Sequence, residues 1–231
     1  MIDGILFDKD GTLFGFDATW GPWARGQVLS LAAGDAGLAA QLADAIGYDL
    51  AAARFARDSA VIGGTVAEVA GLMLPFLPGR DLAGLIADFD SAAQEAPQVP
   101  AVPLRPVLEA LRDHGLALGV ATNDAEASAR VHLRKAGVED LFEFIAGYDS
   151  GHGEKPGPGQ LLAFAAARGL APAAVAMVGD SLHDMGAARA AGMRAVAVLT
   201  GPAPREVLAP ASDLVLPDIS GLADWIAAGA P

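Results

Sequence analysis

From residue 116 onward, short apolar segments alternate with segments of helical periodicity, and this alternation constrains the fold more than any other feature of the chain. The apolar segments predict strands at 116–122, 142–147, 174–179, 194–199 and 213–216, and the other segments predict helices at 125–136, 159–168, 183–191 and 219–228. Strands that alternate with helices of about ten residues form right-handed βαβ units, whose strands lie parallel in one sheet. The sequence therefore predicts an α/β fold built on an open parallel sheet.

A long insertion separates the first strand of this sheet from the others. The first strand is expected at residues 4–8, which are apolar and end in an acid. From about residue 19 to residue 94 no convincing strand pattern appears, and helical segments are expected at 24–33, 36–46, 48–58, 65–77 and 81–94, with a further helix at 105–113. A proline-rich segment, 97–106, precedes the last of these helices as a linker. We therefore expect an α/β domain formed by 1–15 and 98–231, with an all-helical domain inserted at 16–97.

Composition excludes several classes of function. The chain has 231 residues and a formal net charge of −13, and a surface this acidic repels nucleic acids. The same charge repels phosphorylated substrates at long range, so phosphate chemistry needs a local site with a divalent cation. The chain contains no cysteine, which rules out disulfides, thiolate zinc sites and cysteine nucleophiles.

The sequence says less about location and assembly. It contains no run of 18 apolar residues, so no membrane partner is expected, and its first residues do not resemble a signal peptide. We expect a cytoplasmic protein on these grounds. The apolar faces of the inserted helices leave both a monomer and a homodimer open.

Polar side chains occur at the ends of four predicted strands. In open parallel sheets, ligands bind at the carboxyl ends of the strands, so these side chains are expected to converge on one site. The residues concerned are Asp8, Asp10, Thr122, Asn123, Lys155, Asp180 and Asp184.

The chemistry of this set indicates a metal-assisted phosphate site. Its four carboxylates offer only hard oxygen ligands, which Mg²⁺ prefers. Lys155 adds a positive charge and Thr122 a hydroxyl donor, and both can bind phosphoryl oxygens. Taken singly, each feature has a simpler explanation: Asp10-Gly11 as a turn, Thr122 and Asp180-Ser181 as helix caps, and Lys155 as a solvated loop residue. Their occurrence together at successive strand ends favours the site.

Four motifs resemble those of the haloacid dehalogenase superfamily. They are Asp8-Lys9-Asp10-Gly11-Thr12-Leu13, Thr122-Asn123, Lys155-Pro156, and Val178-Gly179-Asp180-Ser181-Leu182-His183-Asp184. The resemblance covers the whole α/β part, and the insertion matches the helical cap of that family in position and type. It implies a Rossmann-like sheet with a helical cap, and the pattern is most similar to phosphoglycolate phosphatase-like hydrolases.

The resemblance implies a role for each motif residue. Asp8 is expected to be the nucleophile that takes the phosphoryl group as an aspartyl-phosphate. Asp10 is expected to act as general acid and base. Thr122, Asn123 and Lys155 are expected to bind phosphate. The expected ligands of Mg²⁺ are the carboxylates of Asp8 and Asp180 and the backbone carbonyl of Asp10, with Asp184 as a further ligand or as a residue that supports the other ligands.

Related activities fit less well. Dehalogenation needs no acid at the position of Asp10, and phosphonoacetaldehyde hydrolysis needs a cap lysine, whereas 14–100 contains none. The expected activity is therefore hydrolysis of a small phosphorylated metabolite, such as a 2-phosphoglycolate-like ester. A phosphosugar mutase and a non-catalytic binding protein remain open as alternatives. The cap is not rich in the basic groups that a mutase needs for a second phosphate: its basic residues are Arg25, Arg54, Arg57 and Arg80.

Other polar residues receive weaker interpretations. Lys9 is expected to point away from Asp8 and Asp10, as alternate residues of an extended segment do, and to have no role. Glu154 could pair with Lys155. The histidines are interpreted as follows: His114 and His132 as residues of helix surfaces, His152 as a candidate substrate contact, and His183 as a weaker candidate. In the cap, the candidate substrate contacts are Phe16, Thr19, Trp20 and the loop Gly63-Gly64-Thr65.

Overall fold

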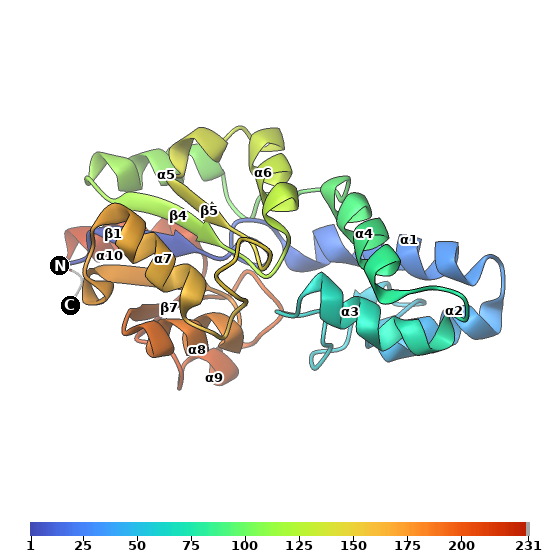
Figure 1. Cartoon of the computed structure of the whole chain (residues 1–231). Coiled ribbons are helices and arrows are strands. Elements are labelled where there is room, and N and C mark those ends of the chain that lie inside the picture. The colour runs from blue at the N-terminus through green and yellow to red at the C-terminus, as the bar shows by residue number, and fades with distance from the viewer. Residues whose placement is uncertain (230–231) are drawn as a thin grey trace.

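The computed structural model describes residues 1–229 and consists of a sheet-containing core and a helical lobe beside it (Figure 1). The core strands form one six-stranded sheet in the order β5-β4-β1-β6-β7-β8. The strands are β1 Gly4–Phe7, β4 Ala117–Ala121, β5 Phe144–Ala146, β6 Val175–Gly179, β7 Arg194–Val198 and β8 Leu214–Leu216. All five pairings are parallel, which confirms the predicted open parallel sheet.

Helices cover both faces of this sheet, as the strand pattern requires. Ile5 and Phe7 point to one face and Leu6 to the other, because successive side chains of a strand alternate. The first face packs on α5 Leu104–Asp113, α6 Glu126–Lys135 and α10 Leu222–Ala227. The second packs on α7 Gly159–Arg168, α8 Leu182–Ala191 and α9 Arg205–Leu208. Short 3₁₀ turns lie at Glu139–Leu141 (η2), Pro172–Ala174 (η3) and Ile219–Gly221 (η4).

The inserted segment forms the second lobe, which we call the cap. Its elements are α1 Phe16–Ala32, α2 Ala36–Ala45, β2 Tyr48–Asp49, β3 Arg54–Phe55, α3 Val66–Met73, η1 Leu74–Phe76 and α4 Leu82–Gln94. The cap has a buried apolar cluster of its own, which runs from Phe16 to Ala96 and includes no residue of the sheet. The predicted boundaries, 16–97 for the cap and 1–15 with 98–231 for the core, remain predictions.

The helix predicted at 48–58 is wrong. This segment is a small antiparallel hairpin, in which Tyr48 pairs with Phe55 and Asp49 with Arg54. The Asp49 carboxylate accepts hydrogen bonds from two backbone N–H groups of the turn, an arrangement that competes with helix formation. The rings of Tyr48 and Phe55 pack 4.9 Å apart and close the hairpin. The insertion is therefore predominantly, but not entirely, helical.

The first cap helix begins earlier than predicted, at Phe16 rather than at residue 24, and contains Pro22. Because proline is unfavourable inside a helix, the sequence predicted that the helix would begin only after Pro22. Phe16, Trp20 and Trp23 recur on one buried face of α1, and this burial outweighs the local penalty.

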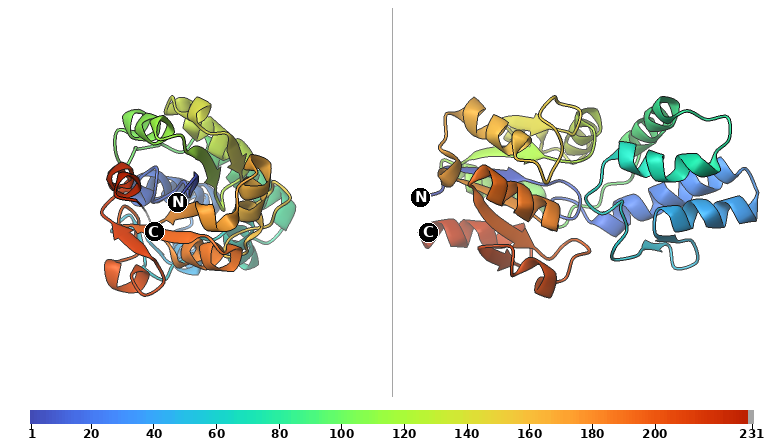
Figure 2. Two further views of the ribbon diagram at one scale, coloured as in Figure 1. Left: turned by 90° about the vertical axis from the view of Figure 1, so that its left-hand side faces the viewer. Right: turned by 60° about the horizontal axis from the view of Figure 1, so that its bottom comes forward.

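The cap covers the carboxyl ends of the core strands. Figure 2 shows the two lobes side by side, with the N-terminus at the end of the core away from the cap. Helix α4 of the cap packs on α6 of the core. Within residues 1–229, every helix is too short or too polar to cross a membrane.

Candidate active site

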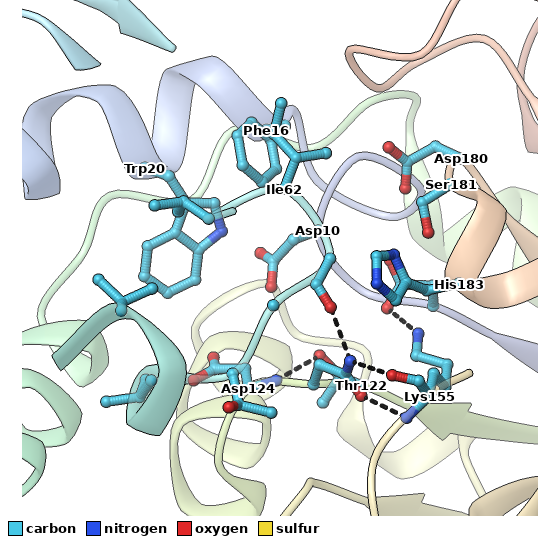
Figure 3. Close-up of a pocket in the computed structure, with 18 of the residues that line it drawn as sticks. Asp10, Phe16, Trp20, Ile62, Thr122, Asp124, Lys155, Asp180, Ser181 and His183 are labelled. Atoms are coloured by element: carbon cyan, nitrogen blue, oxygen red, sulfur yellow. Dashed lines mark hydrogen bonds and ion pairs between the residues drawn. The ribbon is translucent and has the colours of Figure 1, made fainter. Parts of the chain in front are cut away.

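One pocket lies between the strand ends and the cap, and the predicted site residues line it, except Asp184, which is fully buried behind it (Figure 3). Asp8 follows β1, Thr122 follows β4, and Asp180 follows β6, because these strands run parallel and end at one edge. Lys155 comes from the loop after β5. Residues far apart in sequence thus reach a common site.

Three buried carboxylates form the centre of this site. Asp8, Asp180 and Asp184 each offer an oxygen, and these atoms lie within 4.8 Å of one another. The Lys155 ammonium donates hydrogen bonds to Oδ1 of Asp8 at 2.7 Å and to Oδ1 of Asp184 at 2.6 Å. Asp184 also accepts hydrogen bonds from the backbone N–H and the hydroxyl of Ser181, which caps α8.

One ammonium does not balance three carboxylates. Burial, together with the neighbouring carboxylates of Asp184 and Asp10, raises the pKa of Asp8 to about 7, although Lys155 acts in the opposite direction. Burial and the same kind of repulsion raise the pKa of Asp180 well above its usual range. Burial alone would lower the pKa of Lys155, but Asp184 and Asp8 outweigh it and raise that pKa. The site therefore lacks positive charge.

The cluster fits the chemistry of Mg²⁺. All its ligand atoms are carboxylate oxygens, and a divalent cation would supply the missing charge and hold Asp8 and Asp180 in their ionised forms. The Asp10 carboxylate lies outside the cluster of three, so any metal contact of Asp10 would come from its backbone, as the resemblance implies.

The interpretation of Lys9 is wrong. Its side chain is fully buried, and its ammonium lies 2.7 Å from Oδ2 of Asp10 and 3.1 Å from Oδ2 of Asp124. Strand β1 ends at Phe7, so the alternation of an extended segment no longer applies at Lys9. Burial lowers the pKa of Lys9, but the two carboxylates outweigh burial and raise it. Lys9 therefore holds Asp10 in place as a charged partner.

The interpretation of His132 as a surface residue is also wrong. His132 is fully buried, because α4 of the cap covers this face of α6. Burial and the Lys9 charge lower the pKa of His132 to about 4, so the ring is neutral near pH 7. Its Nδ1 accepts from Lys9 at 3.1 Å, and its Nε2 donates to the Ala93 carbonyl of the cap at 2.8 Å. Sequence reasoning missed this network, whose one signal was the presence of a lysine inside the first motif.

The two predicted phosphate-binding residues of the second motif differ in their hydrogen bonds. The Thr122 hydroxyl accepts from the backbone N–H of Asp124 at 3.1 Å and keeps its own proton for another acceptor. The Asn123 amide donates to the carbonyls of Lys155 and Gly63, at 2.9 and 2.7 Å, and accepts from the Lys155 backbone N–H at 2.8 Å. Asn123 therefore joins the lysine loop to the cap.

The loop after β7 was not singled out from the sequence, yet it closes the site. The Thr200 hydroxyl donates to the Gly11 carbonyl at 2.6 Å. A Cβ on Gly201 would lie 1.7 Å from Oδ2 of Asp180, and one on Gly11 would lie 2.4 Å from it. Gly11 has a φ of 84°, which glycine tolerates best. Only glycine leaves room for Asp180 at these two positions.

The remaining polar candidates lie in different places. Lys155 pairs with Asp8 and Asp184, and the predicted pairing with Glu154, which is exposed, is absent among the described residues. His152 is exposed beside Phe144 and does not line the pocket. His183 does line the pocket.

Most cap candidates line the pocket. Phe16, Trp20 and the loop 63–65 form part of its wall. Thr65 also caps α3, where its hydroxyl and the Glu68 carboxylate form a capping box. Thr19 is fully buried and does not line the pocket.

Comparison with known proteins gives a family match over half of the chain. The model of the haloacid dehalogenase-like hydrolase family matches residues 80–198. A phosphoglycolate phosphatase of Rhodospirillum rubrum is 34% identical over 120 residues, which are 52% of this chain and 50% of that protein. The chain thus spans about half the length of this curated relative.

Solved structures share the whole fold. A structure described as a predicted phosphoglycolate phosphatase from Haemophilus somnus has a TM-score of 0.74 at 20% identity, covering 97% of this chain and 98% of that one. A β-phosphoglucomutase from Clostridium difficile has a TM-score of 0.67 at 19% identity, covering 96% and 93%. At these identities the likeness concerns the fold.

Proposed function

Because the chain belongs to the haloacid dehalogenase-like hydrolase family, we propose that it is a Mg²⁺-dependent phosphatase that hydrolyses a small phosphate monoester through an aspartyl-phosphate. The observation that carries this proposal is the buried Asp8 carboxylate, which accepts a hydrogen bond from Lys155 and offers an oxygen within 4.8 Å of oxygens of Asp180 and Asp184. This arrangement offers a nucleophile beside the Lys155 ammonium at the strand end of the pocket.

The reaction has two steps, in which Asp8 acts as nucleophile and Asp10 acts first as general acid and then as general base. An Asp8 oxygen attacks phosphorus, the bond from phosphorus to the ester oxygen breaks, and Asp10 gives its proton to that oxygen. A water then attacks the aspartyl-phosphate, Asp10 takes a proton from the water, and the bond from phosphorus to Asp8 breaks, releasing phosphate. Lys155 and Thr122 stabilise the charge on the phosphoryl oxygens throughout.

Asp8 and Asp180 would hold the Mg²⁺ ion, and Asp184 would be a third ligand or would orient the other two. When bound, the ion supplies positive charge to the phosphoryl oxygens and to the acidic cluster. Lys155 holds Asp8 and Asp184 in position, and Ser181 holds the other oxygen of Asp184.

Two alternatives have less support. A phosphosugar mutase must bind a second phosphate, and the cap residues that line the pocket include no lysine, arginine or histidine among those described. A non-catalytic binding protein would not need Asp10 to be held by a buried lysine.

The substrate follows from the resemblance only as a class. Relatives named phosphoglycolate phosphatase make 2-phosphoglycolate the first ester to assay. A small phosphorylated metabolite as the ligand, the lack of a nucleic-acid partner and a cytoplasmic location remain predictions.

The test is hydrolysis of p-nitrophenyl phosphate with and without EDTA, using Asp8→Asn and Asp10→Asn as variants. We expect activity to vanish in EDTA and to return with Mg²⁺. Asp8→Asn should abolish turnover, and Asp10→Asn should slow it by about 10²–10⁴-fold. Acid quenching should trap phosphate on wild-type protein but not on Asp8→Asn. Full activity without metal, or trapped phosphate in Asp8→Asn, would overturn the proposal.

A further inference from the structure

The pocket has two ends of opposite chemistry. The end at the strands is charged and holds Asp8 and Lys155. The end at the cap begins with Phe16, Trp20 and Trp23, all from one face of α1. Figure 3 shows Trp20 and Phe16 on the side of Asp10 away from Lys155 and His183. The group attached to the ester oxygen, protonated by Asp10, would therefore meet the cap end.

The aromatic wall is held rigidly by other rings. Trp20 and Trp23 pack edge to face with their centroids 5.3 Å apart. Trp23 packs in the same manner on Phe89, and Phe16 on Phe55, at 5.3 and 5.7 Å. Such contacts fix the side chains before any ligand arrives, which lowers the entropy cost of binding an apolar group.

The rest of the apolar cap lining is aliphatic. Val61 and Ile62 come from the loop before α3, and Val66 and Val69 come from α3 itself. These side chains offer dispersion contacts and no hydrogen bond. Together with α1 they leave the cap end without a charged group.

Apart from His183, the basic side chains that could bind a second anionic group lie elsewhere or are already engaged. The four cap arginines, Arg25, Arg54, Arg57 and Arg80, are exposed and do not line this pocket. Lys155 is shared between two carboxylates. His183 lies beside Ser181, and its ring also faces the cap loop, since a Cβ on Gly63 would lie 2.5 Å from Nδ1 of His183.

Several neutral polar side chains of the lining are also engaged, whereas the Thr122 hydroxyl keeps its proton at the charged end and the buried indole N–H of Trp23 has no acceptor among the described residues. The Thr65 hydroxyl bonds with Glu68, the Asn123 amide bonds with two carbonyls, and the Ser181 hydroxyl donates to Asp184. A carboxylate buried against the cap would therefore lose its water and meet no cationic side chain in the aromatic and aliphatic wall, and the single neutral N–H of Trp23 would replace only part of that hydration, which is costly.

From this lining we infer that the substrate carries an uncharged, apolar group on its ester oxygen, in place of the carboxylate of 2-phosphoglycolate or a second phosphate. The inference rests on the proposed phosphatase function and narrows its substrate class. The aromatic and aliphatic wall residues all lie between residues 16 and 69, outside the matched segment 80–198, so the family match does not contradict it.

The test compares two esters of similar leaving-group acidity, phenyl phosphate and 4-carboxyphenyl phosphate, with 2-phosphoglycolate as a third substrate. We expect kcat/KM for phenyl phosphate to exceed that for either carboxylated ester by about tenfold or more. Equal or higher kcat/KM for the carboxylated esters would overturn the inference while leaving the phosphatase proposal intact. If the protein hydrolyses neither these three esters nor p-nitrophenyl phosphate, the phosphatase proposal is overturned, and this inference with it.

Two variants test whether the cap residues cause the preference for an apolar leaving group. Trp20→Ala should lower kcat/KM for phenyl phosphate by about tenfold or more. Ile62→Lys, at a partly exposed position, should narrow the preference for phenyl over 4-carboxyphenyl phosphate. Leu29→Lys, on the exposed surface of α1, is the charge-matched control. An unchanged preference in Ile62→Lys, with folding confirmed by circular dichroism, would overturn the inference.

Discussion

At the scale of single residues, Lys155 is the cation on which the proposed chemistry depends most. Its ammonium is buried between Asp8 and Asp184. Replacing it with Ala removes the charge that stabilises the transferring phosphoryl group, so we expect kcat to fall by about 10²-fold. Steady-state kinetics with p-nitrophenyl phosphate would measure this. Lys135→Ala, at an exposed position, is the control and should retain wild-type turnover; wild-type turnover in Lys155→Ala would contradict the assigned role.

Lys9 carries a separate prediction, about stability. Lys9→Met would leave the buried Asp124 without its cation and Asp10 without its partner. Breaking a buried ion pair on one side costs about 3–5 kcal/mol of unfolding free energy. Urea unfolding should show this loss, and the double variant Lys9→Met/Asp124→Asn should recover part of it. A single variant as stable as the wild type would show that the pair contributes nothing.

At the scale of elements, the contact between α4 of the cap and the core contains a carboxylate with a shifted pKa. Burial and the nearby Asp124 raise the pKa of Asp90 from 3.8 to about 6, although the Tyr148 hydroxyl donates to Asp90 at 3.3 Å and acts against the shift. Because the folded chain holds this proton more tightly than the unfolded chain, the contribution of Asp90 to stability falls as pH rises from about 4 to about 6.

Asp90→Asn removes the loss of stability that ionisation of Asp90 causes at neutral pH. We expect the variant to raise the free energy of unfolding by about 1 kcal/mol at pH 7, after allowance for screening by solvent, and to have little effect at pH 4. Denaturant unfolding at the two pH values measures the difference. Asp88→Asn on the exposed side of α4 is the control and should show no such gain. A pH-independent loss of stability in Asp90→Asn would refute the explanation.

At the scale of the whole molecule, the acidic site lies within a chain whose net charge is already −13. A cation bound to the folded cluster, and not to the unfolded chain, stabilises the protein by mass action. We expect Mg²⁺ to raise the melting temperature by several degrees, and Asp180→Asn to abolish that increase. Scanning calorimetry with and without EDTA tests this. Asp113→Asn, at an exposed position of α5, is the control. An equal increase in Asp180→Asn would place the cation elsewhere.

The sequence by itself determined the sheet and the position of the site. Alternating apolar segments define strands, and parallel strands joined by helices must end at one edge, so Asp8, Thr122 and Asp180 were expected to meet there. The outline of the inserted cap also followed from its periodicity. The helical pattern of 48–58 gave a wrong prediction, because the Asx turn of Asp49 and the packing of Tyr48 on Phe55 stabilise a hairpin there.

Only the tertiary structure decided what surrounds the site. Lys9 meets His132 across 123 sequence positions, and Thr12 meets Asp180 across 168. The apolar wall of the pocket likewise depends on how α1 and α3 pack against the strand ends. Periodicity describes which face of an element is apolar, but not which distant segment covers that face. The packing of cap on core therefore buries Lys9 and His132 and leaves the cap end of the pocket apolar.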